Sequence, residues 1–203
     1  MPRVNSFVQR ILHAFVHGFA LIWFGWHFFL AVNDQLGGDP VEALIHFTGL
    51  SALQALWLSL LISPLAKHFK QSRLMVLRRP LGLYAFFYGF AHILAYLVLE
   101  IDLDWATFIE DIFSRVYISV GIVAFALLLA LAITSIPFLK RACGRGWQTL
   151  HNWVFIAASL SLIHFWLSVK SDISEPILYS AFLIAVLIPR FSYWKKLSLW
   201  QLR

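Results

Sequence analysis

Six long apolar segments restrict the fold of this chain more than any other feature of its sequence. They cover residues 11–32, 44–66, 80–99, 116–139, 147–169 and 176–194. Most of them reach the ~20 residues that an α-helix needs to cross a hydrocarbon layer ~30 Å thick. Helices also satisfy their own backbone hydrogen bonds, which lipid cannot do for them. We therefore expect an all-α fold, an integral membrane bundle of six transmembrane helices that forms a single domain over residues 1–203.

The overall composition agrees with a lipid environment. Hydrophobic residues make up 61% of the chain and charged residues 13%, whereas a soluble domain has about 25% charged residues. The single cysteine, Cys143, excludes an internal disulfide, a multi-cysteine zinc site and a cysteine-ligated iron–sulfur cluster within one chain. We find no glycine-rich phosphate loop, and few residues follow the last apolar segment, so we expect no nucleotide-binding domain.

The charged residues alternate between the two ends of the expected helices. All ten Asp and Glu residues fall in the loops after the first, third and fifth segments, and every Lys and Arg except Arg115 and Lys170 lies in or beside the other loops and the termini. Because loops rich in Lys and Arg stay in the cytoplasm, we expect both termini to be cytoplasmic. A nucleic-acid surface would not alternate helix by helix, so the net charge of +6 does not indicate one.

Histidine is the polar residue that the expected helices contain at depth. They contain no acidic residue, lysine or arginine there, which argues against a proton pump or an ion exchanger. Imidazole is a ligand of haem iron, and facing histidines on neighbouring helices form cofactor sites in bundle cores. The histidines in or beside the segments are His13, His17, His27, His46, His68, His92, His151 and His164.

Depth along the helices indicates which histidines could share an iron. At 1.5 Å per residue, His92 lies ~20 Å, His151 ~6 Å and His164 ~26 Å from the inner edge of its helix. His92 and His164 therefore share the outer half and His151 the inner half, which suits one or two b-type haems. Because 164 − 151 = 13 residues, the side chains of His151 and His164 point ~140° apart on a straight helix. The helix must then use two faces or be distorted.

The inner partner of His151 stays open at this point. His17 lies at ~10 Å and His13 at ~5 Å from the inner edge, and His68 lies in the adjoining loop. Each of these histidines could instead bond a backbone carbonyl.

Three stretches of the sequence carry a more specific pattern. They are Gly37-Gly38-Asp39-Pro40 through His46-Phe47-Thr48-Gly49, Arg78-Arg79-Pro80-Leu81-Gly82-Leu83 leading to His92, and Trp147-Gln148-Thr149-Leu150-His151-Asn152 leading to His164. Together they resemble the MsrQ (YedZ) family, the haem-binding membrane subunits of the periplasmic methionine sulfoxide reductase system, over about residues 10–195. That family belongs to the wider ferric-reductase-like transmembrane group.

The resemblance implies a function. It implies a multi-pass protein of the bacterial inner membrane that holds haem b and FMN and takes electrons from the quinol pool or a cytoplasmic flavin reductase. It further implies delivery of those electrons to MsrP, a soluble molybdopterin subunit that reduces methionine sulfoxide and so repairs oxidised periplasmic proteins. The chain would then be an electron-transfer subunit rather than the catalytic one. We expect its acidic outer loops to help dock that acceptor.

The resemblance also implies site residues. Carried over by position, His92, His151 and His164 are the ligands of haem iron. Arg79 stands 92 − 79 = 13 residues before His92, where the oxidases of the wider group have histidine, so the second ligand of an inner haem stays open. Arg78 and Arg79 could hold the FMN phosphate, although membrane topology explains these arginines equally well.

Two other functions compete with this one. The first is a free-standing ferric or metal reductase, a cytochrome b whose acceptor is a small ion. The second is a haemless membrane scaffold or transporter, whose histidines only bond the backbone.

Overall fold

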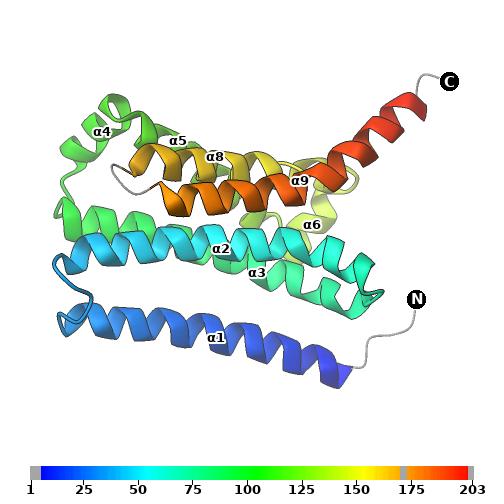
Figure 1. The fold of residues 1–203 in the computed structure, drawn as a ribbon, viewed down its shortest axis with the longest axis horizontal. Coiled ribbons are helices and arrows are strands. Elements are labelled where there is room, and N and C mark those ends of the chain that lie inside the picture. The colour runs from blue at the N-terminus through cyan, green and yellow to red at the C-terminus, as the bar shows by residue number, and fades with distance from the viewer. Residues whose placement is uncertain (1–5, 170–172, 201–203) are drawn as a thin grey trace.

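Every regular element in the described part of the chain is helical. The computed structural model describes residues 6–169 and 173–200 (Figure 1). The elements in chain order are α1 (Ser6–Val32), α2 (Pro40–His68), the 3₁₀ turn η1 (Ser72–Leu77), α3 (Arg78–Ala95), the π turn η2 (Tyr96–Glu100), α4 (Trp105–Ser114), α5 (Val116–Ile133), α6 (Pro137–Cys143), α7 (Gly146–His151), α8 (Val154–Ser168) and α9 (Ser174–Trp200). The all-α expectation is confirmed.

Five helical stretches among the described residues are long and apolar enough to cross a membrane. They are Phe7–Val32, Pro40–His68, Ser72–Glu100, Val116–Ile133 and Gly146–Ser168. The sixth expected span, residues 176–194, lies in α9, whose apolar part Ser174–Ile188 is shorter. A multi-pass membrane protein is therefore confirmed, whereas the count of six spans stays a prediction.

The start of α1 and the end of α9 lie at the same end of the bundle (Figure 1). The side of the membrane that this end faces stays a prediction from the charge pattern. Four of the charged residues behind that pattern, Arg3, Lys170, Asp172 and Arg203, lie outside the described residues.

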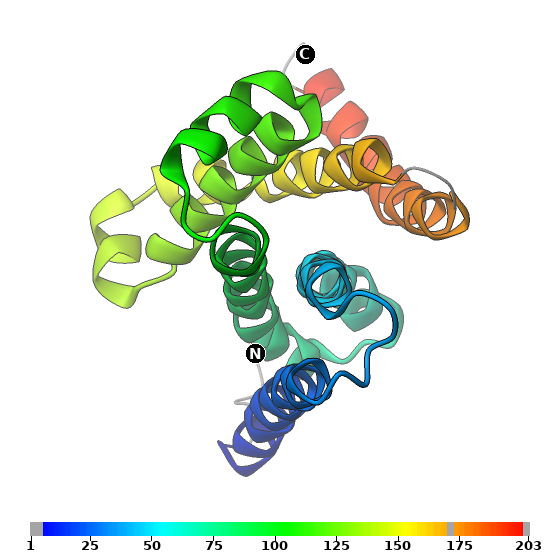
Figure 2. The same cartoon turned by 90° about the vertical axis from the view of Figure 1, so that its left-hand side faces the viewer.

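Helix α2 lies at the centre of the bundle. It packs chiefly against α3 and also contacts η1, α1, α8 and α9. Viewed along the bundle, α2 and α3 lie between α1 and the group of α5, α8 and α9 (Figure 2). The buried core joins these helices through Leu53, Leu56 and Leu60 of α2, Ala85 of α3, Leu128 of α5, Ala157 and Ala158 of α8, and Leu183 and Val186 of α9.

The surface of the bundle is apolar, which is the pattern expected for a protein whose solvent is lipid. Phe15 and Ile22 of α1, for example, are 70% and 73% exposed. Inside the bundle, small side chains let the helices approach closely. Ala85, Ala157 and Ala158 have no exposed surface at all.

Asp39 and Asp104 set the starts of α2 and α4. The carboxylate of Asp39 accepts hydrogen bonds from the backbone N–H groups of Val41 and Glu42 at 2.9 and 3.1 Å, so α2 begins at Pro40, earlier than the expected residue 44. Asp104 caps α4 in the same way. The sequence analysis did not predict α4, because its polar residues interrupt the apolar pattern of a span.

Two expected helices are interrupted. The expected helix 116–139 ends at Ile133. There the hydroxyl of Thr134 donates to the carbonyl of Ala130 at 2.7 Å, and Pro137, which has no N–H to continue the helix, begins α6 instead. The expected helix 147–169 is divided by a turn at residues 152–153 into α7 and α8.

Candidate functional site

His92 of α3 and His164 of α8 meet in the half of the bundle away from the start of α1, which the expected orientation makes the outer half. Their ring centroids are 6.0 Å apart and their planes are nearly perpendicular, at 84°. Depth along the helices predicts that these two residues meet, and the structure brings them together from helices that are far apart in the sequence. Their role as haem ligands stays a prediction.

Each of these two rings bonds a backbone carbonyl on a neighbouring helix, α2 for His92 and α5 for His164. Nδ1 of His92 lies 2.9 Å from the carbonyl oxygen of Ile45 on α2, and Nδ1 of His164 lies 2.7 Å from that of Tyr117 on α5. A carbonyl can only accept, so Nδ1 carries the proton and donates in both rings. This leaves each Nε2 deprotonated and without a hydrogen-bond partner among the described residues. A deprotonated imidazole nitrogen is what a metal ligand requires.

The pair fits the iron of a haem. Two imidazoles bound to one metal at about 2 Å each have ring centroids about 6 Å apart, which agrees with the observed 6.0 Å. The donor set also fits, because two neutral imidazoles are sufficient for an iron whose other four ligands come from a porphyrin. By contrast, no cluster of three or more His, Cys, Asp or Glu side chains that could hold a metal ion without a cofactor occurs in the described part of the chain.

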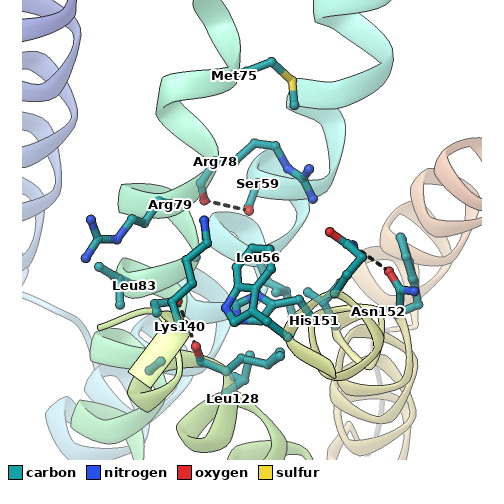
Figure 3. A pocket seen from close by; sticks show the side chains of 18 of the residues that line it. Leu56, Ser59, Met75, Arg78, Arg79, Leu83, Leu128, Lys140, His151 and Asn152 are labelled. Atoms are coloured by element: carbon teal, nitrogen blue, oxygen red, sulfur yellow. Dashed lines mark hydrogen bonds between the residues drawn. The ribbon is translucent and has the colours of Figure 1, made fainter. Parts of the chain in front are cut away.

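A cavity of about 1070 Å³ lies between α2, α3, α5 and α7, at the end of the bundle where α1 starts, which the expected orientation makes the inner end. Figure 3 shows the guanidinium group of Arg78, the amine of Lys140 and the ring of His151 around it, while the side chain of Arg79, also a lining residue, extends away from them. The remaining wall is largely apolar and includes Leu56, Leu83, Leu128, Leu131 and Phe155. A large cavity with apolar walls and a few convergent polar groups is typical of a cofactor site.

His151 is fixed at this cavity by the end of α5. Its Nε2 lies 3.2 Å from the hydroxyl of Thr134. Trp147, four residues earlier on α7, stacks on its ring with centroids 4.0 Å apart and donates from Nε1 to the carbonyl of Thr134 at 3.0 Å. The Lys140 amine lies 4.2 Å from the centroid of the Trp147 ring. The turn that separates α7 from α8 lies between His151 and His164. It is a local distortion of the kind that their spacing requires.

Arg78 presents a buried donor that the protein leaves unused. Its Nε is buried without a hydrogen-bond partner in the described residues, while its backbone carbonyl accepts from the Ser59 hydroxyl at 3.0 Å. A half-buried guanidinium with no carboxylate partner among the described residues is suited to a phosphate or a carboxylate of a bound cofactor.

The structure does not bring His17 to His151. Nδ1 of His17 lies 2.9 Å from the hydroxyl of Tyr84, and His17 does not line the inner cavity. His13 instead lies with Nε2 3.3 Å from the carbonyl of Val76. Among the described residues, His151 is the one histidine in the wall of this cavity. The second ligand of an inner haem therefore stays open.

The sequence analysis missed Thr134 and the stacking role of Trp147 as parts of the inner site. The spacing of Trp147 and His151 carried a signal, because residues four apart on a helix are neighbours. The contact of both with Thr134 depends on the packing of α7 against the end of α5, which spacing alone does not show.

The sequence is similar to known membrane haem proteins over most of its length. A model of the ferric reductase like transmembrane component matches residues 47–163, which include His92 and His151 and end one residue before His164. The protein-methionine-sulfoxide reductase heme-binding subunit MsrQ of Xanthomonas euvesicatoria pv. vesicatoria (strain 85-10) is 44% identical over 176 residues, 87% of this chain and 80% of the relative. The protein of the same name from Brucella ovis (strain ATCC 25840 / 63/290 / NCTC 10512) is 41% identical over 167 residues, 82% of this chain and 76% of the relative.

Proposed function

This chain belongs to the MsrQ family of haem-binding membrane subunits, and from that premise we propose that it carries electrons across the bacterial inner membrane to a periplasmic methionine sulfoxide reductase. The acceptor in this proposal is MsrP, the soluble molybdopterin subunit, and the donor is the quinol pool or a cytoplasmic flavin reductase. The chain then serves the repair of oxidised periplasmic proteins as an electron-transfer subunit and leaves the chemistry on the sulfoxide to its partner.

The observation that carries this proposal is the pair His92 and His164 with both Nδ1 atoms bonded to carbonyls. Haem b held between them would supply a one-electron carrier inside the bundle. The two imidazoles would both bind the iron and leave it no open position. An iron with no open position is suited to electron transfer rather than to oxygen chemistry.

The inner cavity supports a second cofactor site below the first. His151 would bind the iron of an inner haem there, or the cavity would hold FMN. In either case Arg78 and Lys140, with Arg79 beside them, give its wall positive charge, which would neutralise haem propionates or a flavin phosphate.

The two sites lie one above the other along α3. Leu83 lines the inner cavity and His92 belongs to the outer pair, so their heights differ by about 14 Å at 1.5 Å per residue. Phe86 and Phe90 of α3 occupy the intervening positions and stack on Phe125 of α5. The stack therefore places apolar rings at the heights between the two sites.

Anaerobic reduction of the purified protein tests the proposal. The protein should show a Soret band with a bis-histidine spectrum, which quinol or reduced flavin reduces and which MsrP with methionine sulfoxide reoxidises. His92→Ala and His164→Ala should each remove the contribution of the outer haem to that band while the protein still inserts in the membrane. A protein without a Soret band after expression with ample haem would be the haemless scaffold or transporter. Reoxidation by ferric chelates but not by MsrP would identify a free-standing metal reductase.

A further inference from the structure

A glycine lies against the ring of each histidine of the outer pair. A Cβ built on Gly49 of α2 would lie 3.0 Å from both Nδ1 and Cε1 of His92, and one built on Gly121 of α5 would lie 2.8 Å from Nδ1 and 3.0 Å from Cε1 of His164. Contacts under 3.0 Å are closer than real Cβ atoms tolerate, and those at 3.0 Å already require the neighbour to move. Each ring therefore occupies space that any other residue on the facing helix would take.

The two contacts repeat one arrangement. His92 donates to the carbonyl of Ile45, and Gly49 follows Ile45 by 49 − 45 = 4 residues. His164 donates to the carbonyl of Tyr117, and Gly121 follows Tyr117 by 121 − 117 = 4 residues. In an α-helix the side chain of residue i+4 points toward the N-terminus, over the carbonyl of residue i. A glycine at i+4 leaves that carbonyl open to a donor from a neighbouring helix. The ring of each histidine enters through this opening, and the carbonyl accepts from its Nδ1–H as well as from the backbone N–H of its own helix.

Other glycines in the spans do not have this contact. A Cβ on Gly89, in the same helix as His92, would come no closer than 3.6 Å to another atom outside its helix, and one on Gly25 of α1 would meet nothing within 4 Å. Glycine at positions 49 and 121 is also not explained by close approach of two helix backbones, because the three nearest atoms to each added Cβ all belong to a histidine ring.

We propose that Gly49 and Gly121 are positioning residues for haem ligation, each of which opens one helix so that the histidine ring lodges against it and donates Nδ1–H to the carbonyl one turn earlier. This inference rests on the proposed haem site between His92 and His164. The carbonyl bonds fix the tautomer that leaves Nε2 free for iron, and they make each imidazole a stronger electron donor. A stronger donor stabilises ferric iron and so lowers the midpoint potential.

The first experiment compares Gly49→Ala and Gly121→Ala with Gly89→Ala and Gly25→Ala. The first two variants should lose the low-spin bis-histidine signature or retain haem with a more positive midpoint potential, and their affinity for haem should fall by about 10- to 100-fold. The two control variants should keep the spectrum and the potential of the unchanged protein. Full haem content with an unaltered spectrum and potential in Gly49→Ala and Gly121→Ala would overturn the inference.

The second experiment remains informative where a variant folds poorly. In haem-free protein in detergent, Gly49→Ala should lower the melting temperature on its own but not in a His92→Ala background, because the ring that the new methyl group meets is gone. Gly121→Ala and His164→Ala should couple in the same way, whereas the crossed pair of Gly49→Ala and His164→Ala should be additive. Equal losses in both backgrounds would mean that the methyl group meets something else, and the inference would be wrong.

The two experiments also separate this inference from the proposed function. If the unchanged protein binds no haem, or if His92→Ala and His164→Ala both retain the outer haem, the proposed function is wrong. In that event the melting temperatures of the single and double variants still decide whether each glycine accommodates its histidine ring. If the histidine variants lose haem as expected and the glycine variants do not, only the positioning role is wrong.

Discussion

Asp111 and Arg115 form an ion pair at the outer end of the bundle, with the carboxylate 2.9 Å from Nε of the arginine. Asp111 is buried, with 5% of its surface exposed, and it also accepts a hydrogen bond from the hydroxyl of Tyr96. Arg115 is one of two basic residues that depart from the charge alternation, and this pairing explains its place among the acids. A hydrogen bond to the Tyr117 hydroxyl, followed by the charge of Asp111, raises the pKa of Arg115.

The same pairing predicts that Asp111 matters for stability. Asp111→Ala should lower the free energy of unfolding by about 2 kcal/mol, since it leaves the Tyr96 hydroxyl and the guanidinium without their acceptor. The arginine is half exposed and can turn to water, which limits the loss. Thermal unfolding in detergent measures it. Glu110→Gln, at the exposed neighbouring position, is the matched control and should change stability by less than about 0.5 kcal/mol. An equal loss in both variants would contradict the role of the pair.

The remaining outer acids predict an electrostatic contribution to acceptor docking. Asp102, Asp104 and Glu110 are exposed near α4, and hydrogen bonds from the hydroxyl and N–H of Thr107 and the N–H of Ala106 lower the pKa of Asp104, which keeps it charged. Charged surfaces speed association, and salt screens them beyond ~10 Å at 0.1 M. Electron transfer to MsrP should therefore slow as ionic strength rises, and less so in Asp102→Asn/Glu110→Gln protein. A rate that salt does not change would leave topology as the reason for these acids.

Arg78 and Arg79 lead to a prediction about the inner cofactor. Replacing both by Gln should reduce the FMN that copurifies with the protein while the spectrum of the outer haem is unchanged, because His92 lies about 14 Å along α3 from Leu83, a residue of the cavity wall. Flavin fluorescence of the denatured extract, relative to haem content, is the measurement. Lys67→Gln/Lys70→Gln removes two nearby charges that do not line the large cavity and serves as the control. If flavin content is the same in all three proteins, the two arginines are not its site.

Trp147 should hold His151 in place chiefly by stacking. Trp147→Phe keeps a ring against the imidazole and loses the bond from Nε1 to the carbonyl of Thr134, at a cost of about 1 kcal/mol. Trp147→Ala loses both and should cost about 2 kcal/mol. We expect the spectrum of any inner haem to survive the first change and to be lost with the second, with the outer haem intact in both. Identical spectra in the two variants would show that the stacking does not position His151.

The sequence predicted the apolar spans and the heights of the histidines well, because both depend on a fixed rise per residue. The similar heights of His92 and His164, which allow the two rings to meet, followed from that rise. The ends of the helices depended on side chains that act locally. Pro137 and Thr134 end α5 early, and Asp39 starts α2 sooner than hydropathy indicates.

What the sequence did not predict depends on how the helices are rotated about their axes. The height of a residue along its helix does not show which neighbour its side chain meets. The contacts of the His92 ring with Gly49 and of the His164 ring with Gly121 could not be predicted from it. Nor could the bond of His17 to Tyr84, which turns His17 away from the inner cavity. Helix α4 was missed for a different reason. It lies in a loop between spans, and its acids, which the charge argument used for topology, obscured its apolar face.

Haem assignment provides the last prediction, and it rests on the observed pair. If His92 and His164 bind one iron between them, His92→Ala and His164→Ala should remove the same outer haem and stop electron delivery to the periplasm equally. His151→Ala should remove a different, inner haem if two are present. It would then block reduction by the cytoplasmic or quinol donor, while dithionite still reduces the outer haem. If one haem binds, His151→Ala should leave its bis-histidine spectrum nearly unchanged.

Haem content and low-temperature spectra of the three variants are the measurement, each after membrane insertion has been verified. His27→Ala is a suitable control, since its Nδ1 lies 3.0 Å from the carbonyl of Trp23 in its own helix and it is in neither site. It should keep every haem signal. If His92→Ala resembled His151→Ala and differed from His164→Ala, the iron would not lie between α3 and α8. The 6.0 Å approach of the two rings would then reflect packing of two carbonyl-bonded histidines, and not an axial pair.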